Sequence, residues 1–168
     1  LRTHYRTLDR EPNLEPMRVT IYTDGAASGN PGPGGYGVVL ESNAGHRKEL
    51  NGGFRKTTNN RMELLAVIVG LRELKSTEVA VTVVSDSKYV VDAINKGWLR
   101  SWVKKGFKDK KNPDLWRLMI PLLDRYNPTF QWVKGHNNHP QNERCDALAV
   151  QASKQSNLPA DTGYESSL

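Results

Sequence analysis

Short runs of alternating apolar and polar residues come first along the chain. Residues 18–23 (RVTIYT) alternate with period two, as a half-buried strand does, and they stop at the turn pair Asp24-Gly25. A glycine-rich loop follows, and strand patterns recur near residues 36–41 and 46–54. This part of the chain therefore predicts a meander of three strands.

Helical spacing dominates the rest of the chain. Residues 60–74 place apolar side chains along one side of a helix, and residues 79–84 are a β-branched run typical of a buried central strand. The remaining patterns predict helices at 87–94, from about 98, at 114–125 and at 141–153, with a strand at 130–133. The order βββαβαααβα predicts an α/β fold with a mixed five-stranded sheet, in which an antiparallel meander continues into parallel strands and helices cover both faces.

The two ends of the chain lack this patterning. Residues 1–16 show neither period and carry two prolines, so we expect a disordered leader. Residues 155–168 are polar, with Pro159 and Gly163, and predict a flexible tail. The 168-residue chain therefore has one expected domain, residues 17–154.

Composition narrows the class of protein. The net charge is +6, which favours a polyanionic partner such as nucleic acid, although many basic proteins bind none. No apolar run approaches the length of about 20 residues that a membrane helix needs, and no secretory signal pattern begins the chain. The single cysteine, Cys145, cannot form an internal disulfide, which is compatible with a reducing environment, and we expect a cytoplasmic protein.

Four acidic residues stand at positions that suit a metal site. Asp24 and Asp86 directly follow predicted strands, Glu63 lies near the start of the first long helix, and Asp146 lies in the last helix. If the four carboxylates meet, they repel one another unless cations lie between them. Carboxylate oxygens suit Mg²⁺ or Mn²⁺, and two such ions can support phosphodiester hydrolysis.

Each acid also has a simpler structural explanation. Asp24 before glycine is a common turn residue, and Glu63 or Asp86 could complete a helix cap. Asp146 could be an exposed helix acid. Periodicity alone does not bring the four together.

The segments around these acids supply the link. They are residues 21–37 (IYTDGAASGNPGPGGYG), 57–64 (TTNNRMEL), 85–90 (SDSKYV) and 133–149 (VKGHNNHPQNERCDALA). In this order they resemble the motifs of type 1 ribonuclease H, over roughly residues 18–154. The resemblance implies the ribonuclease H-like fold and an endonuclease that cuts the RNA strand of RNA–DNA hybrids, leaving 5′-phosphate and 3′-hydroxyl ends.

The resemblance also assigns roles to residues. It makes Asp24, Glu63, Asp86 and Asp146 ligands of two Mg²⁺ ions, with Mn²⁺ as an alternative. His136 matches a histidine of a mobile loop that moves protons or helps to release product. The candidate substrate contacts are Asn30, Thr58, Asn59, Asn60, Lys88, Trp98, Lys104, Lys105, Asn112 and Trp116.

Most of the DNA-strand candidates fall in residues 98–116, which we call the basic segment. It carries six positive and two negative side chains, for a net charge of +4. Basic and aromatic side chains interleave in it, as they do where a protein contacts phosphates and stacks on bases. Trp98 and Trp116 match groove aromatics, whereas Trp102 is expected in the core. The segment after Gly106 is shorter than in family members with a longer basic protrusion.

Other interpretations stay open. His136, His139 and Cys145 could suggest zinc, but only three ligands are in view and Cys145 is inside a helix. The rivals for function are another nuclease on the same scaffold, a catalytically silent hybrid-binding module and a fragment of a reverse transcriptase. No obligate protein partner is evident, and a monomer is expected.

Overall fold

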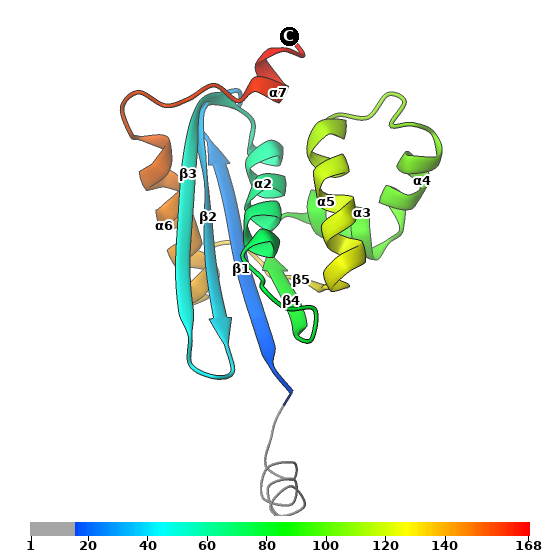
Figure 1. Cartoon of the computed structure of the whole chain (residues 1–168). Coiled ribbons are helices and arrows are strands. Elements are labelled where there is room, and N and C mark those ends of the chain that lie inside the picture. Colours follow the sequence, from blue (N-terminus) through cyan, green and yellow to red (C-terminus); the bar gives the residue numbers. More distant parts are fainter. Residues whose placement is uncertain (1–15) are drawn as a thin grey trace, which may run out of the picture.

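A mixed five-stranded sheet forms the centre of the molecule (Figure 1). The computed structural model describes residues 16–168, so the predicted leader lies outside the described residues except for Pro16. The strands are β1 (Arg18–Ala27), β2 (Gly32–Ser42), β3 (Arg47–Thr57), β4 (Ala80–Ser85) and β5 (Thr129–Trp132), in the order β3-β2-β1-β4-β5. β2 pairs antiparallel with both β1 and β3. On the other side of β1, β4 pairs parallel with β1, and β5 pairs parallel with β4. The predicted mixed sheet is confirmed.

Helices cover both faces of this sheet, as Figure 1 shows. The helix α6 (Pro140–Ser153) packs on one face, against β1, β2 and β3. On the other face lie α2 (Asn59–Arg72) and α5 (Pro113–Tyr126), with α3 (Lys88–Asn95) and α4 (Trp98–Lys104) beside them. A further short helix, α7 (Thr162–Glu165), follows α6. Among the described residues, no helix is long and apolar enough to cross a membrane.

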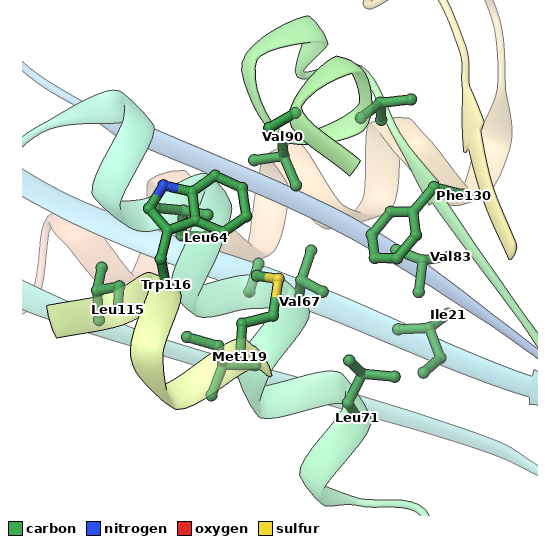
Figure 2. Close-up of a cluster of buried hydrophobic side chains, with 14 of the residues drawn as sticks. Ile21, Leu64, Val67, Leu71, Val83, Val90, Leu115, Trp116, Met119 and Phe130 are labelled. Atoms are coloured by element: carbon green, nitrogen blue, oxygen red, sulfur yellow. The ribbon is translucent and has the colours of Figure 1, made fainter. Parts of the chain in front are cut away.

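The main core fills the space between the sheet, α2 and α5. Leu64, Val67 and Leu71 follow one another at helical spacing on α2 and are fully buried. They meet Ile21 of β1 and Trp116 of α5, as Figure 2 shows. Because a fully buried side chain of this size contributes about 1.5–3 kcal/mol, this layer holds α2 firmly against the centre of the sheet.

The first strand is longer than its pattern predicts. Asp24 and Gly25 do not form a turn: they continue β1 and pair with Gly37 and Tyr36 of β2. The chain turns later, at residues 28–31, where Asn30 has a φ of 26°. Pairing with β2 across the sheet outweighs the local turn preference of the Asp-Gly pair.

The end of the chain also differs from its prediction as a flexible tail. Residues 159–168 pack against the domain, and Asp161 among them is buried. The segment has little apolar surface, but its polar groups have specific partners. The backbone N–H of Arg55 donates to the carbonyl of Pro159 at 2.9 Å, and Arg55 pairs with Glu165. Composition cannot reveal such pairs, because the partners are about 100 residues away along the chain.

Candidate active site

Three of the four predicted acids meet at one edge of the sheet. Asp24, Glu63 and Asp86 each present an oxygen such that these atoms lie within 4.8 Å of one another. Asp24 lies in β1 one residue beyond the last β1–β4 pair, Thr23 with Ser85, and Asp86 directly follows Ser85. The two strands are parallel, so equivalent positions at their carboxyl ends are neighbours.

A close approach of α2 to β1 adds Glu63 to this pair. Helix α2 begins beyond Thr58, whose hydroxyl accepts a hydrogen bond from the Arg61 N–H at 3.2 Å. The strand residue facing the helix is Gly25, and a Cβ there would lie 2.4 Å from the backbone nitrogen of Glu63. The Gly25 N–H donates to Glu63 Oε1 at 3.1 Å and to Asp24 Oδ1 at 2.9 Å. Only glycine lets strand and helix come this close.

The cluster is electrostatically unfavourable without a cation. Burial, and then the charge of Asp86, raises the pKa of Asp24 to about 7. Burial and the charges of Asp24 and Asp86 raise the pKa of Glu63 well above its usual range. Glu63 Oε2 is buried and accepts no hydrogen bond from residues 16–168. Packed carboxylates with an unpartnered buried oxygen fit a bound divalent cation, which would offset both the repulsion and the desolvation.

Asp146 and His136 flank the cluster without joining it. Asp146, on α6, lies outside the group of three, but its charge adds to the rise in the pKa of Asp24. Burial is the main cause of the raised pKa of Asp86, and His136 opposes that rise. The loop that carries His136 passes directly over Asp86, since a Cβ on Gly135 would lie 2.8 Å from Asp86 Oδ2. The structure thus places all five predicted residues in one region.

Two of the three residues of the zinc alternative, His139 and Cys145, have structural roles instead. His139 caps α6, where its Nδ1 accepts a hydrogen bond from the Asn142 N–H at 3.3 Å. Its ring packs on Tyr22, with 5.5 Å between the centroids. Cys145 lies within α6 and is buried against Val39 of β2, and burial raises the pKa of its thiol.

The polar residues predicted to contact substrate form a connected surface. Asn30 Oδ1 accepts from the Asn59 N–H at 2.9 Å, and Asn59 Oδ1 accepts from the Ala27 N–H at 2.6 Å. These bonds tie the glycine-rich loop to the start of α2. A pocket of about 790 Å³ opens there, and among its lining residues are Asn30, Thr58, Asn59, Asn60, Lys110, Lys111 and Asn112.

The basic segment is partly exposed and partly core. Trp98, at the start of α4, is 44% exposed, and Lys104 and Lys105, at the end of this helix, are also exposed. The prediction that Trp116 lines the substrate groove is wrong, because its side chain is fully buried. The Trp116 indole N–H donates to the Tyr89 hydroxyl at 3.0 Å inside the core. The apolar side of α5 buries this residue, and motif matching alone does not show that orientation.

Sequence reasoning missed Trp132, at the end of β5. Its indole N–H donates to the Asp86 carbonyl at 3.0 Å, and the Lys88 ammonium lies 4.8 Å from the centre of its ring. Trp132 thereby links the backbone of one clustered acid to a predicted substrate contact. Its position at the end of a strand, beside the closing motif, is the signal that could have revealed it.

Comparisons with known proteins agree with this geometry. The family model described as RNase H matches residues 16–154. The chain belongs to the RNase H family. Within it, the ribonuclease H of Rippkaea orientalis (strain PCC 8801 / RF-1) is 56% identical over 158 residues, which cover 91% of this chain and 96% of that relative.

Solved structures of RNase H proteins extend the likeness to the fold. LC9-RNase H1, a type 1 RNase H with the type 2 active-site motif, superposes with a TM-score of 0.73 at 33% identity, covering 92% of this chain and 82% of that chain. LC11-RNase H1, solved in complex with an RNA/DNA hybrid, superposes with a TM-score of 0.57 at 28% identity, covering 80% and 95%. The resemblance to type 1 ribonuclease H that the motifs predict is confirmed.

Proposed function

We propose that this chain hydrolyses the RNA strand of RNA–DNA hybrids as an endonuclease. The observation that carries the proposal is the group of Asp24, Glu63 and Asp86, whose oxygens lie within 4.8 Å of one another. Membership of the RNase H family supports it, as does the relative LC11-RNase H1, which has been solved with an RNA/DNA hybrid.

The acidic cluster fits hard divalent cations. Asp24, Glu63 and Asp86 would hold Mg²⁺, or Mn²⁺ in its place, and Asp146 would support a second ion. When bound, such ions activate a water molecule and stabilise the oxygen that leaves phosphorus. The products would carry 5′-phosphate and 3′-hydroxyl ends.

The protein's own groups orient the substrate and move protons. The Gly25 N–H holds Glu63 and Asp24 in place, so the carboxylates need little rearrangement on binding. We assign to His136 the transfer of a proton between the site and solvent or help with product release, and the course of its loop over Asp86 supports this role.

Substrate selection follows from the flanking surfaces. A hybrid-specific enzyme must distinguish 2′-hydroxyls from deoxyribose, and the amides and hydroxyl of Asn30 and Thr58–Asn60 can donate and accept hydrogen bonds to do so. We assign Lys88 to the RNA strand. The basic segment, with Trp98, Lys104 and Lys105, suits the phosphates of the DNA strand. Asn112 would contact the DNA backbone from the pocket.

Cleavage of matched duplexes tests this proposal. The protein is incubated with labelled RNA–DNA hybrid, single-stranded RNA, duplex RNA and duplex DNA, in Mg²⁺ or in EDTA. We expect cuts in the RNA of the hybrid only, and only with Mg²⁺. Equal cleavage of duplex RNA, or full activity in EDTA, contradicts the proposal. Binding of hybrid without any cleavage supports the catalytically silent module instead.

The role of the cluster has its own test in Asp24→Asn. Removing this carboxylate should abolish cleavage while the affinity for hybrid stays within about twofold, because the binding side chains are untouched. Gel analysis of cleavage and fluorescence anisotropy with labelled hybrid measure the two quantities. A variant that cleaves at the wild-type rate refutes the assignment of Asp24.

We further propose that the protein is a monomer and that it is located in the cytoplasm. Gel filtration tests the first proposal and cell fractionation tests the second.

A further inference from the structure

The last ten residues form part of the pocket beside the active site. We call residues 159–168 the C-terminal segment; it lies beyond residue 154, where the family match ends. Figure 1 shows α7 beside the beginning of α2. Gly163, Tyr164, Ser167 and Leu168 line the pocket opposite the start of α2, together with Lys110 and Lys111. A predicted flexible tail is thus a wall of the proposed substrate surface.

One buried guanidinium joins this wall to the rest of the pocket. Arg61, 3% exposed, donates from Nε and Nη2 to the two carboxylate oxygens of Asp161, at 2.8 and 2.9 Å. Its Nη1 and Nη2 donate to the carboxylate of Asp114 at 2.9 and 2.7 Å. Nη1 also donates to Asn112 Oδ1 at 3.3 Å. The C-terminal segment, α2 and the start of α5 therefore meet at Arg61.

Asp161 is fixed in turn by its own contacts. The Thr57 hydroxyl donates to Asp161 Oδ2 at 2.7 Å. Burial raises the pKa of Asp161, but hydrogen bonds from Arg61 and Thr57 outweigh this and lower it overall, so the carboxylate stays charged. Gly163 packs directly on the network, since a Cβ there would lie 2.1 Å from Asp114 Oδ2 and 2.8 Å from Arg61 Nη2.

The network decides how Asn112 faces the pocket. Because Arg61 has donors only, it holds the oxygen of the Asn112 side-chain amide and turns the NH₂ group away from itself. One of these N–H bonds reaches the Tyr89 hydroxyl at 3.2 Å. The second has no partner among residues 16–168, and Asn112 lines the pocket. It is a free donor of the kind that a phosphate or sugar oxygen accepts.

We infer that the C-terminal segment positions Asn112 to bind the nucleic-acid backbone, acting through Asp161 and Arg61. This inference rests on the proposed function, because the ligand is the RNA–DNA hybrid. Asp161 is a positioning residue: it lies behind Arg61 and presents no group of its own to the hybrid. A guanidinium is a rigid fork, so loss of one of its carboxylates lets it rotate and releases the amide.

For Asp161→Asn, the loss of a negative charge and the loss of Asn112 positioning predict opposite changes in the affinity for hybrid. Removing a negative charge near a polyanion tightens binding by simple electrostatics. Our inference predicts weaker binding. We expect the Kd for labelled hybrid in EDTA, and the KM in Mg²⁺, to rise about threefold to tenfold, the scale of one neutral hydrogen bond, with kcat within about twofold. The acids that set kcat lie outside this network.

Glu165→Gln is the matched control. It removes the same charge from the same segment, but Glu165 pairs with exposed Arg55 and does not reach Asn112. We expect its Kd to stay within about twofold of wild type or to fall slightly. Equal weakening by both variants would show that general loosening of the segment is responsible, and would overturn the inference.

A double-mutant cycle tests the route through Asn112. In an Asn112→Ala background, Asp161→Asn should add no further loss of affinity, whereas an additive loss contradicts the inference. Gly163→Ala gives a second variant that keeps every charge, and it should raise Kd by shifting Arg61 and Asp114. If Asp161→Asn fails to fold, the Kd of Gly163→Ala still shows whether displacement of Arg61 weakens the binding of hybrid.

The outcomes separate this inference from the proposed function. A wild-type protein that neither binds nor cuts hybrid overturns both. A wild-type protein that cuts hybrid, with Asp161→Asn binding as tightly as wild type or tighter, overturns only the inference. A selective rise in Kd and KM that vanishes in the Asn112→Ala background supports it.

Discussion

Each carboxylate of the acidic cluster destabilises its neighbours while no cation lies between them. Asp24 has a pKa of about 7, because burial and the nearby charge of Asp86 oppose its ionisation. The ordinary pKa of an aspartate is 3.8. Between pH 3.8 and about 7, Asp24 therefore keeps its proton in the folded protein, whereas the same group has lost it in the unfolded chain. The arrangement that prepares the site for a cation therefore lowers the stability of the cation-free protein.

This cost sets the direction of a pH dependence. In EDTA, the contribution of Asp24 to stability is fully present below pH 3.8 and is lost as the pH rises to about 7. Asp24→Asn should therefore gain stability over wild type, by roughly 1–3 kcal/mol at pH 7.5 and by less at pH 5. Urea unfolding at both pH values measures the difference.

The control for this experiment is Asp92→Asn. Among residues 16–168, the Asp92 side chain pairs with Lys96 alone, in a half-exposed ion pair, so its removal should leave stability close to wild type at both pH values. A stability gain for Asp24→Asn that is equal at the two pH values is inconsistent with the shifted pKa.

Trp132 connects the backbone of Asp86 to the surface. Trp132→Phe keeps the ring under Lys88 but loses the N–H that holds the Asp86 carbonyl. We expect the Mg²⁺ concentration for half-maximal cleavage to rise about tenfold, as for other residues that orient metal ligands. Calorimetric Mg²⁺ titration without hybrid gives an independent measure. Lys88→Gln keeps the Trp132 indole N–H and should bind Mg²⁺ as tightly as wild type does. An equal loss of Mg²⁺ affinity in both variants contradicts a role for this N–H.

The contact between β1 and α2 controls the geometry of the site at the scale of elements. The strand and the helix lie so close at Gly25 that no side chain fits between them. The position and length of α2 follow from its apolar spacing, and the order of strands and helices follows from the patterns of the chain. The course of β1 through Asp24 and Gly25 does not, because it depends on their pairing with Gly37 and Tyr36 of β2, whereas the local signal of the Asp-Gly pair favours a turn.

Gly25→Ala tests this contact. A Cβ that meets backbone atoms of Met62 and Glu63 at 2.4 Å must push strand and helix apart, so we expect a loss of about 3 kcal/mol or more and a large loss of cleavage. Gly45→Ala is the comparison: Gly45 has a φ of +87° but open space around it, which costs about 1 kcal/mol of strain and should leave cleavage unchanged. Thermal unfolding and cleavage rates of both variants decide the question.

Positive charge is spread unevenly along the chain. The net charge of +6 indicates a polyanionic partner, and the basic segment accounts for much of it. Motif order was sufficient to predict the family, and three of the four acids that it singled out, Asp24, Glu63 and Asp86, meet in the structure. Burial of Trp116 and the packing of the C-terminal segment were not predictable, because both depend on contacts between distant parts of the chain.

Salt dependence tests the role of the basic segment. The double variant Lys104→Gln/Lys105→Gln should bind hybrid more weakly, and the slope of log K against log salt should become shallower by about 2. A second double variant, Arg72→Gln/Lys75→Gln, removes two exposed charges at the far end of α2 and should leave the slope nearly unchanged. Equal changes in both variants indicate an effect of net charge alone.

The parallel pairing of β1 with β4, and the packing of α6 over β1, have a consequence for protein synthesis. The three clustered acids are translated first, whereas His136 and Asp146 emerge from the ribosome only after most of the chain. Until α6 has left the exit tunnel and packed on the sheet, a growing chain lacks a complete site. We therefore expect nascent chains to leave nearby hybrids uncut until α6 has packed on β1 and β2.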